Sequence, residues 1–162
     1  MPDETKIIDA DLSRVDHQTA IVAMLDEFMR DPDDDGTPLP EAAKRDLIPG
    51  LRAHPACYVF LAYRGDAPVG FSICFLGFST FNARPLLNIH DIFVDSSARG
   101  KGIGRMLLDS IESKARELNC CRLTLEVRED NQVARGLYRK VGFDIVKVGP
   151  KKVPMEFWRK PL

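Results

Sequence analysis

The apolar positions of the first half of the chain divide it into short strands and helices. Residues 6–10 form a short strand candidate, and apolar residues then recur at helical spacing, at Ile21, Leu25, Phe28 and Met29. The segment 31–40 is dense in Asp, Pro and Gly, which predicts a loop, and residues 41–54 are typical of a second helix. Residues 57–63 and 69–78 flank a turn-like Gly65-Asp66, which predicts an antiparallel hairpin, and residues 86–94 predict a further strand.

The second half begins with the most regular helical pattern in the chain. Its apolar face consists of Ile103, Leu107, Ile111, Ala115 and Leu118. Residues 121–127 then alternate strictly between apolar and polar, which predicts a strand. Asn131 is a suitable cap for a helix that Gly142 would end. Strands near residues 143–148 and 153–158 are expected to close the chain.

The predicted order is β-α-α-β-β-β-α-β-α-β-β, which is α/β in class. Hairpins require antiparallel pairing, whereas each strand-helix-strand crossover favours parallel pairing. We therefore expect a mixed, mostly antiparallel central sheet flanked by helices. No repeat or linker interrupts the sequence, so residues 1–162 are expected to form a single domain.

The composition is that of an ordinary globular protein, with 44% hydrophobic and 29% charged residues and a net charge of −1. No apolar run approaches the roughly 18 residues of a membrane span, and the N-terminus lacks a signal-peptide pattern, so a cytoplasmic protein without a membrane partner is expected. Cysteines and histidines show no metal-ligand spacing, so no metal is expected. The sequence pI of about 6.3 argues against a nucleic-acid partner.

The distribution of charge is uneven: residues 1–81 hold 14 acidic and 7 basic side chains, and residues 82–162 hold 10 and 16. Within the basic half, the segment Arg99-Gly-Lys-Gly-Ile-Gly104 opens the long predicted helix. Glycines let a ligand approach the backbone closely, and a helix start presents free N–H groups and positive potential. Together with the side chains of Arg99, Lys101 and Arg105, these features predict a diphosphate site.

Two common phosphate motifs do not fit this segment. A Walker loop needs Ser or Thr directly after Gly-Lys, and no such residue is present. A dinucleotide fingerprint needs Gly-x-Gly-x-x-Gly, but its last position falls on Arg105 or Leu107 here. What fits is Arg/Gln-x-x-Gly-x-Gly/Ala at Arg99, Gly102 and Gly104.

In this motif, the sequence resembles the GNAT superfamily of acetyl-CoA-dependent N-acetyltransferases. The strand before the motif, the helix after it and the later Asn131…Ala134…Leu137-Tyr138…Gly142-Phe143 extend the resemblance over about residues 86–144. The resemblance implies a GNAT-type acyltransferase fold with acetyl-CoA as co-substrate. It implies that the pyrophosphate binds the loop formed by Arg99, Gly100, Lys101, Gly102, Ile103 and Gly104, with Arg105 adjacent.

The resemblance also assigns roles outside this loop. The pantetheine arm is expected along Ile92, Phe93 and Val94, and Asn131 matches a position that often contacts the cofactor, although it also suits a helix cap. Tyr138 corresponds to the general acid that protonates the departing thiolate. His90 is the first candidate for the base that deprotonates the amine, with Asp91, Glu126 and a water chain as alternatives.

The sequence leaves more than one candidate for the amine that accepts the acetyl group. Acceptor pockets of this superfamily are built largely from the first two helices and their loop, which here carries Asp31, Asp33, Asp34 and Asp35 and suits a small cationic amine. A protein N-terminus or lysine is the alternative acceptor, and an acetyl-CoA-binding sensor module is the alternative without catalysis. Such proteins often form homodimers, so a homodimer is one state to expect.

Overall fold

The computed structural model describes residues 4–32 and 34–162 and divides the chain into two compact units, residues 1–126 and 127–162. The first unit contains β1 (Thr5–Asp9), α1 (Val15–Arg30), α2 (Glu41–Ala53), β2 (Cys57–Arg64), β3 (Ala67–Ser79), β4 (Arg84–Val94), a 3₁₀ turn η1 (Ser96–Ala98), α3 (Ile103–Glu117) and β5 (Leu123–Leu125). The second contains α4 (Gln132–Lys140), β6 (Lys147–Val148) and β7 (Val153–Pro154). Apart from η1, this is the predicted order.

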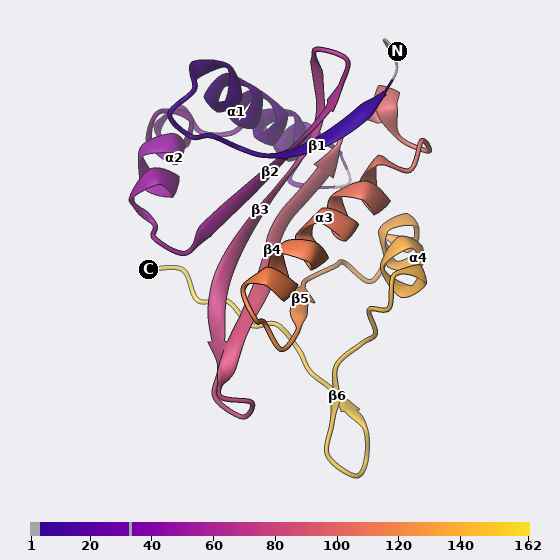
Figure 1. Ribbon diagram of the computed structural model, residues 1–162. Coiled ribbons are helices and arrows are strands. Elements are labelled where there is room, and N and C mark those ends of the chain that lie inside the picture. The colour runs from indigo at the N-terminus through magenta and orange to yellow at the C-terminus, as the bar shows by residue number, and fades with distance from the viewer. Residues whose placement is uncertain (1–3, 33) are drawn as a thin grey trace. The chain divides into compact units, whose positions relative to one another are not determined.

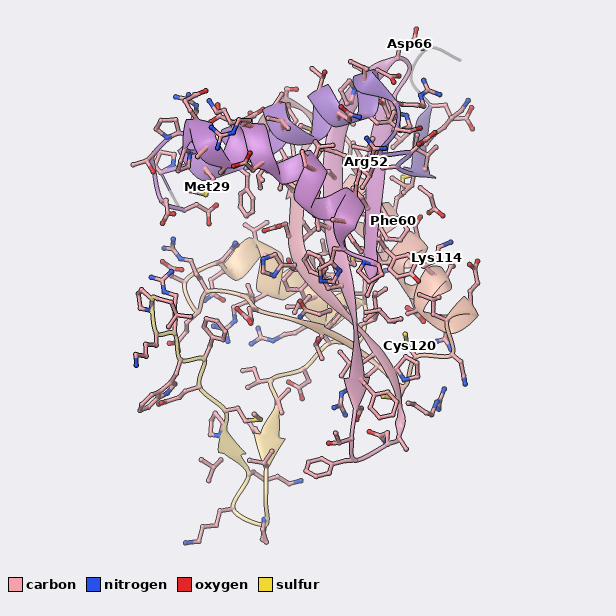
Figure 2. The ribbon with its side chains drawn as sticks, turned by 90° about the vertical axis from the view of Figure 1, so that its left-hand side faces the viewer. Met29, Arg52, Phe60, Asp66, Lys114 and Cys120 are labelled. Carbon is pink, nitrogen blue, oxygen red and sulfur yellow. The ribbon has the colours of Figure 1, made fainter. Side chains whose placement is uncertain are left out.

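The sheet of the first unit has the order β1-β2-β3-β4-β5. Its first four strands pair antiparallel, and β4 pairs with β5 in parallel, so the predicted mixed, mostly antiparallel sheet is confirmed. Figure 1 shows α1 and α2 on one face of this sheet and α3 on the other. Figure 2 shows the same layers from the side of α1 and α2, which the labels Met29 and Arg52 mark.

Each face of the sheet has its own apolar core. On one face, residues of α1 and α2 such as Ile21 and Leu51 pack against Phe71 and Ile73 of β3. On the other face, α3 buries the predicted stripe, except that Leu118 is its half-buried C-cap. In the described ranges, no helix is both long and apolar enough to cross a bilayer.

Three predicted strands are shorter than expected. β5 covers only residues 123–125 of the predicted 121–127, because β4 offers it partners over three residues only. The strands expected near residues 143–148 and 153–158 are only the two-residue strands β6 and β7. These two strands pair with each other in a separate two-stranded sheet. Pro154 has no N–H to donate, which limits how far this pairing extends.

Candidate active site

β4 carries a β-bulge at His90. Ile73 of β3 pairs with Asp91, whereas the following residue, Cys74, pairs with Ile89, so His90 is the extra residue. Cross-strand partners share a face of the sheet. Asp91 therefore lies on the same face as Ile73, which α1 and α2 cover, whereas Ile89 lies on the opposite face. The bulge redirects the second half of β4.

The bulge also marks the point where β4 and β5 separate. β5 pairs with Leu87, Asn88 and Ile89 and with no later residue of β4. Within the described part of the first unit, no strand pairs with this edge of β4 from His90 to Val94. An edge of this kind presents backbone N–H and C=O groups to an extended ligand.

The open edge leads directly into the glycine loop. Asp95 caps η1 by accepting a hydrogen bond from the Ser97 N–H at 2.8 Å. Gly100 and Gly102 follow with φ of +76° and +81°, a region that favours glycine, and α3 begins at Ile103. The N–H groups of the first helical turn have no intrahelical acceptor and lie at the positive end of the helix dipole. Backbone N–H groups are therefore available at the loop where the sequence predicts an anion site.

The three cations around this loop differ in their partners. Arg105 pairs with Asp109 at 3.1 Å, and Lys101 donates to the Ser97 carbonyl at 3.1 Å. Both side chains are exposed beside the loop.

The side chain of Arg99 contacts residues of β4 and the end of α1. Its Nε donates to the Val94 carbonyl at 3.0 Å, its Nη2 donates to Asp31 Oδ2 at 3.3 Å, and its guanidinium carbon lies 6.0 Å from the centre of the Phe93 ring. The sequence predicts Arg99 as one of three cations at the diphosphate site, and the structure adds these partners. Asp31 neutralises part of the charge of Arg99, because the end of α1 reaches the loop.

Two further carboxyl groups belong to this corner of the molecule. The Glu27 carboxyl on α1 forms a hydrogen bond with Asp95, and burial together with the charge of Asp95 raises the pKa of Glu27. The hydrogen bonds from Ser97 hold the pKa of Asp95 below its usual range. Sequence reasoning missed Glu27, because the pair Asp26-Glu27 near the end of α1 gives no local sign of an approach to Asp95.

The predicted acidic loop is anchored at both ends. Asp26 on α1 accepts a hydrogen bond from the Leu39 N–H at 2.7 Å, and the Asp34 N–H donates to the Asp31 carbonyl at 2.8 Å. Asp31 itself joins the glycine loop through Arg99. Asp33 lies outside the described residues.

The three candidate bases meet where β4 and β5 separate. His90 is exposed at the bulge, and Asp91 beside it is half-buried, with burial raising the pKa of Asp91 and the charge of His90 lowering it. Glu126 is exposed and directly follows Leu125, the partner of Ile89. All three candidates therefore lie at or next to the open edge of β4.

The second unit holds the other two predicted residues. Asn131 caps α4, with its Oδ1 accepting from the Ala134 N–H at 3.1 Å, so the predicted capping role is confirmed. Tyr138 is buried, its ring centre lies 5.9 Å from that of Phe143, and burial raises its pKa. A phenol with a raised pKa stays protonated at neutral pH, as a proton donor must.

Among the residues that the structure describes, no group of three or more His, Cys, Asp or Glu side chains is placed to hold a metal ion.

Comparison with known proteins decides the family. The family model described as "Acetyltransferase (GNAT) family" matches residues 21–143. The chain belongs to this family. The match covers both the open edge of β4 with its glycine loop and the helix that carries Tyr138.

Two curated relatives show the range of this GNAT protein's neighbours. Streptothricin acetyltransferase of Streptomyces lavendulae is 37% identical over 112 residues, which cover 69% of this chain and 54% of that protein. N-alpha-acetyltransferase RimI of Mycobacterium tuberculosis is 38% identical over 86 residues, covering 52% of each chain. The chain spans about half the length of these relatives.

The fold of this GNAT protein also occurs among solved structures. Aminoglycoside N-acetyltransferase AAC(6')-Iy in complex with CoA superposes with a TM-score of 0.76 at 15% identity, covering 97% of that chain and 99% of this one. At this identity, the likeness shows the fold.

Proposed function

We propose that this GNAT protein transfers the acetyl group of acetyl-CoA to a primary amine by direct attack. The observation that carries the proposal is the open edge of β4 from His90 to Val94, which runs into the glycine loop and the start of α3. A strand edge suits an amide-containing arm, and a helix N-terminus suits a diphosphate. Coenzyme A contains both in one molecule.

The residues of the loop fit the co-substrate. Gly100 and Gly102 are exposed, and a Cβ atom at either position would have no neighbour within 4 Å, so the approach to the backbone is open. In the proposal, Ile92, Phe93 and Val94 pair with the pantetheine arm. The N–H groups of residues 100–104 bind the diphosphate, with Lys101 and Arg105 beside it. Asn131 contributes a contact in addition to its cap, and Arg99 holds the loop in place.

Proton transfer is assigned to two residues. His90 accepts the proton that the ammonium loses, because its exposed imidazole lies at the bulge where the open edge of β4 begins. Asp91 stabilises the resulting imidazolium, and Glu126 and water remain the alternatives. Tyr138 donates its phenolic proton to the departing thiolate. The nitrogen loses a second proton as the C–N bond forms and the C–S bond breaks, and a proton from solvent restores the Tyr138 phenol, so the products are the amide, the free thiol of CoA and one released proton.

The proposed acceptor is a small cationic amine. Its support is the acidic sequence of the loop after α1, with Asp31, Asp34 and Asp35, because the family resemblance places acceptor pockets beside this loop. The streptothricin acetyltransferase relative agrees with a small-molecule acceptor. The N-alpha-acetyltransferase relative supports a peptide amine as the second candidate. The family match runs from residue 21 to residue 143 and so includes residues of both units, which supports one catalytic domain built from both.

The test follows free-thiol release from acetyl-CoA with polyamines, amino acids, aminoglycosides and N-terminal peptides as acceptors. Tyr138→Phe is compared with wild type, and Tyr63→Phe on β2 is the matched control. We expect release with one amine class, at least tenfold slower in Tyr138→Phe with unchanged acetyl-CoA affinity. Equal turnover would remove Tyr138 from the mechanism. Acetyl-CoA binding without release for any amine would favour a sensor.

A further inference from the structure

Two aromatic side chains that the proposed chemistry does not use form a chain of ring contacts with His90, in which Phe75 contacts His90 and His54 contacts Phe75. The ring centres of Phe75 and His90 are 5.4 Å apart at 72°, and those of His54 and Phe75 are 4.8 Å apart at 58°. These three rings, here called the aromatic strip, come from three different segments of the first unit. Such distances are typical of edge-to-face and tilted aromatic contacts.

The aromatic strip lies on the α1/α2 face of the sheet. Phe75 follows Ile73 by two residues on β3, so both side chains point to the same face, and Phe75 packs against the core there. His90 sits at the bulge where β4 and β5 part. The strip therefore leads away from the point where the amine must meet the acetyl group.

Backbone hydrogen bonds fix the position of His54. It ends α2, with its N–H donating to the Leu51 carbonyl at 3.2 Å, and its Nδ1 accepts from the Ala56 N–H at 3.3 Å. The Ala56 carbonyl in turn accepts from the Leu76 N–H of β3 at 2.8 Å. This turn holds the imidazole beside Phe75 before any ligand binds, and pre-organised groups bind ligands at lower entropic cost.

The strip is accessible to a ligand. His54 and His90 are exposed, and Phe75 is half-buried between them. We propose that the aromatic strip receives the body of the acceptor and selects a primary amine carried on a short arm beside a planar ring. The ring of the acceptor packs on His54 and Phe75 while its amine reaches His90. This inference rests on the proposed function, because it names the acceptor of that reaction.

The first experiment measures binding without turnover. The chain contains three histidines, His17, His54 and His90, so their imidazole C–H signals are resolvable by NMR. Phenethylamine and, separately, hexylamine are titrated in the presence of CoA. His17 is the internal control, since it is buried and its Nδ1 accepts from the Asp11 N–H. We expect phenethylamine to shift the His54 and His90 signals and hexylamine to leave His54 unchanged. A His54 signal that phenethylamine does not move would overturn the proposal.

The second experiment measures selectivity. The ratio of kcat/KM for phenethylamine to that for hexylamine is determined for wild type, Phe75→Leu and His54→Ala. Aromatic contacts of this kind correspond to roughly three- to tenfold in affinity, so we expect the ratio to fall by that factor. His54→Phe, which keeps a ring, should restore most of it. Phe78→Leu, at an exposed position on the same strand, is the matched control.

The experiments distinguish a failure of the aromatic strip as an acceptor site from a failure of the proposed acetyl transfer. An unchanged ratio in both strip variants contradicts the role of the strip and leaves acetyl transfer intact. A His54 signal that phenethylamine shifts, without thiol release from acetyl-CoA for any amine, contradicts the proposed reaction and leaves the strip as a binding site.

Discussion

The guanidinium of Arg99 donates to the carboxylate of Asp31 at 3.3 Å, across 68 positions of sequence. This contact ties the loop after β4 to the C-terminal end of α1 and to the loop that begins there. The segment proposed to bind the diphosphate and the segment proposed to meet the acceptor therefore share an ion pair.

Asp31→Asn is expected to strengthen acetyl-CoA binding two- to fivefold at low salt, because the charge of Arg99 is no longer neutralised beside an anion site. The melting temperature should change little, since partly exposed ion pairs contribute little to stability. Isothermal titration at two ionic strengths measures the effect, which salt should reduce. Asp46→Asn, which removes the partner of Arg45 on α2, is the control. Weaker binding in Asp31→Asn would show that the pair positions Arg99 rather than neutralising it.

Gly70→Ala is expected to destabilise the first unit by ~1–3 kcal/mol, because the added Cβ would lie 2.8 Å from the Phe93 carbonyl oxygen and force β3 and β4 apart. Urea unfolding measures this. Gly50→Ala on α2 is the matched control, since its Cβ would meet nothing within 4 Å, and the change should stabilise the helix by about 0.5–1 kcal/mol. Equal effects of the two substitutions would contradict the close approach at Gly70.

Asp91→Asn is expected to raise the stability of the protein at neutral pH. Burial raises the pKa of Asp91 in the folded state, so its contribution to stability is fully present below the unfolded pKa of about 3.9 and is lost as pH rises through the folded pKa. The variant lacks this loss, so its advantage over wild type should grow as pH rises from about 4 and level off above the folded pKa of Asp91. Urea unfolding at several pH values measures it. A constant difference across these pH values would contradict the burial of the charge.

The two roles of Asn131 are separable by substitution. Asn131→Ser keeps an N-cap acceptor for the Ala134 N–H, so α4 should retain its stability, whereas Asn131→Ala should lose about 1 kcal/mol. If Asn131 also contacts the co-substrate, both variants should bind acetyl-CoA several-fold more weakly, as measured by titration. Wild-type affinity in Asn131→Ser would leave the cap as its only role.

Local patterns in the sequence were enough for much of the fold. The helical stripe of α3, the hairpin around Gly65 and the capping roles of Asn131 and Gly142 all depend on residues close in sequence, and each is found in the structure. The glycine loop at residues 99–104 was also predictable from sequence, because a left-handed backbone favours glycine whatever packs around it.

The features that sequence did not reveal depend on distant partners. The bulge at His90 follows from the register with β3, and its only local signal is the adjacent polar pair His90-Asp91 in an apolar strand. The engagement of Arg99 by Asp31 requires α1 to end beside the loop. The aromatic strip needs a turn, β3 and the bulge to come together.

The most direct test of the account is amide hydrogen exchange with and without saturating acetyl-CoA, read at residues 90–94 and 100–105. If the open edge of β4 and the glycine loop bind the co-substrate, amides in both segments should exchange more slowly, while those of Leu87 and Ile89, already within the sheet, should not change. Saturated binding with unchanged exchange in both segments would contradict the assignment of this site.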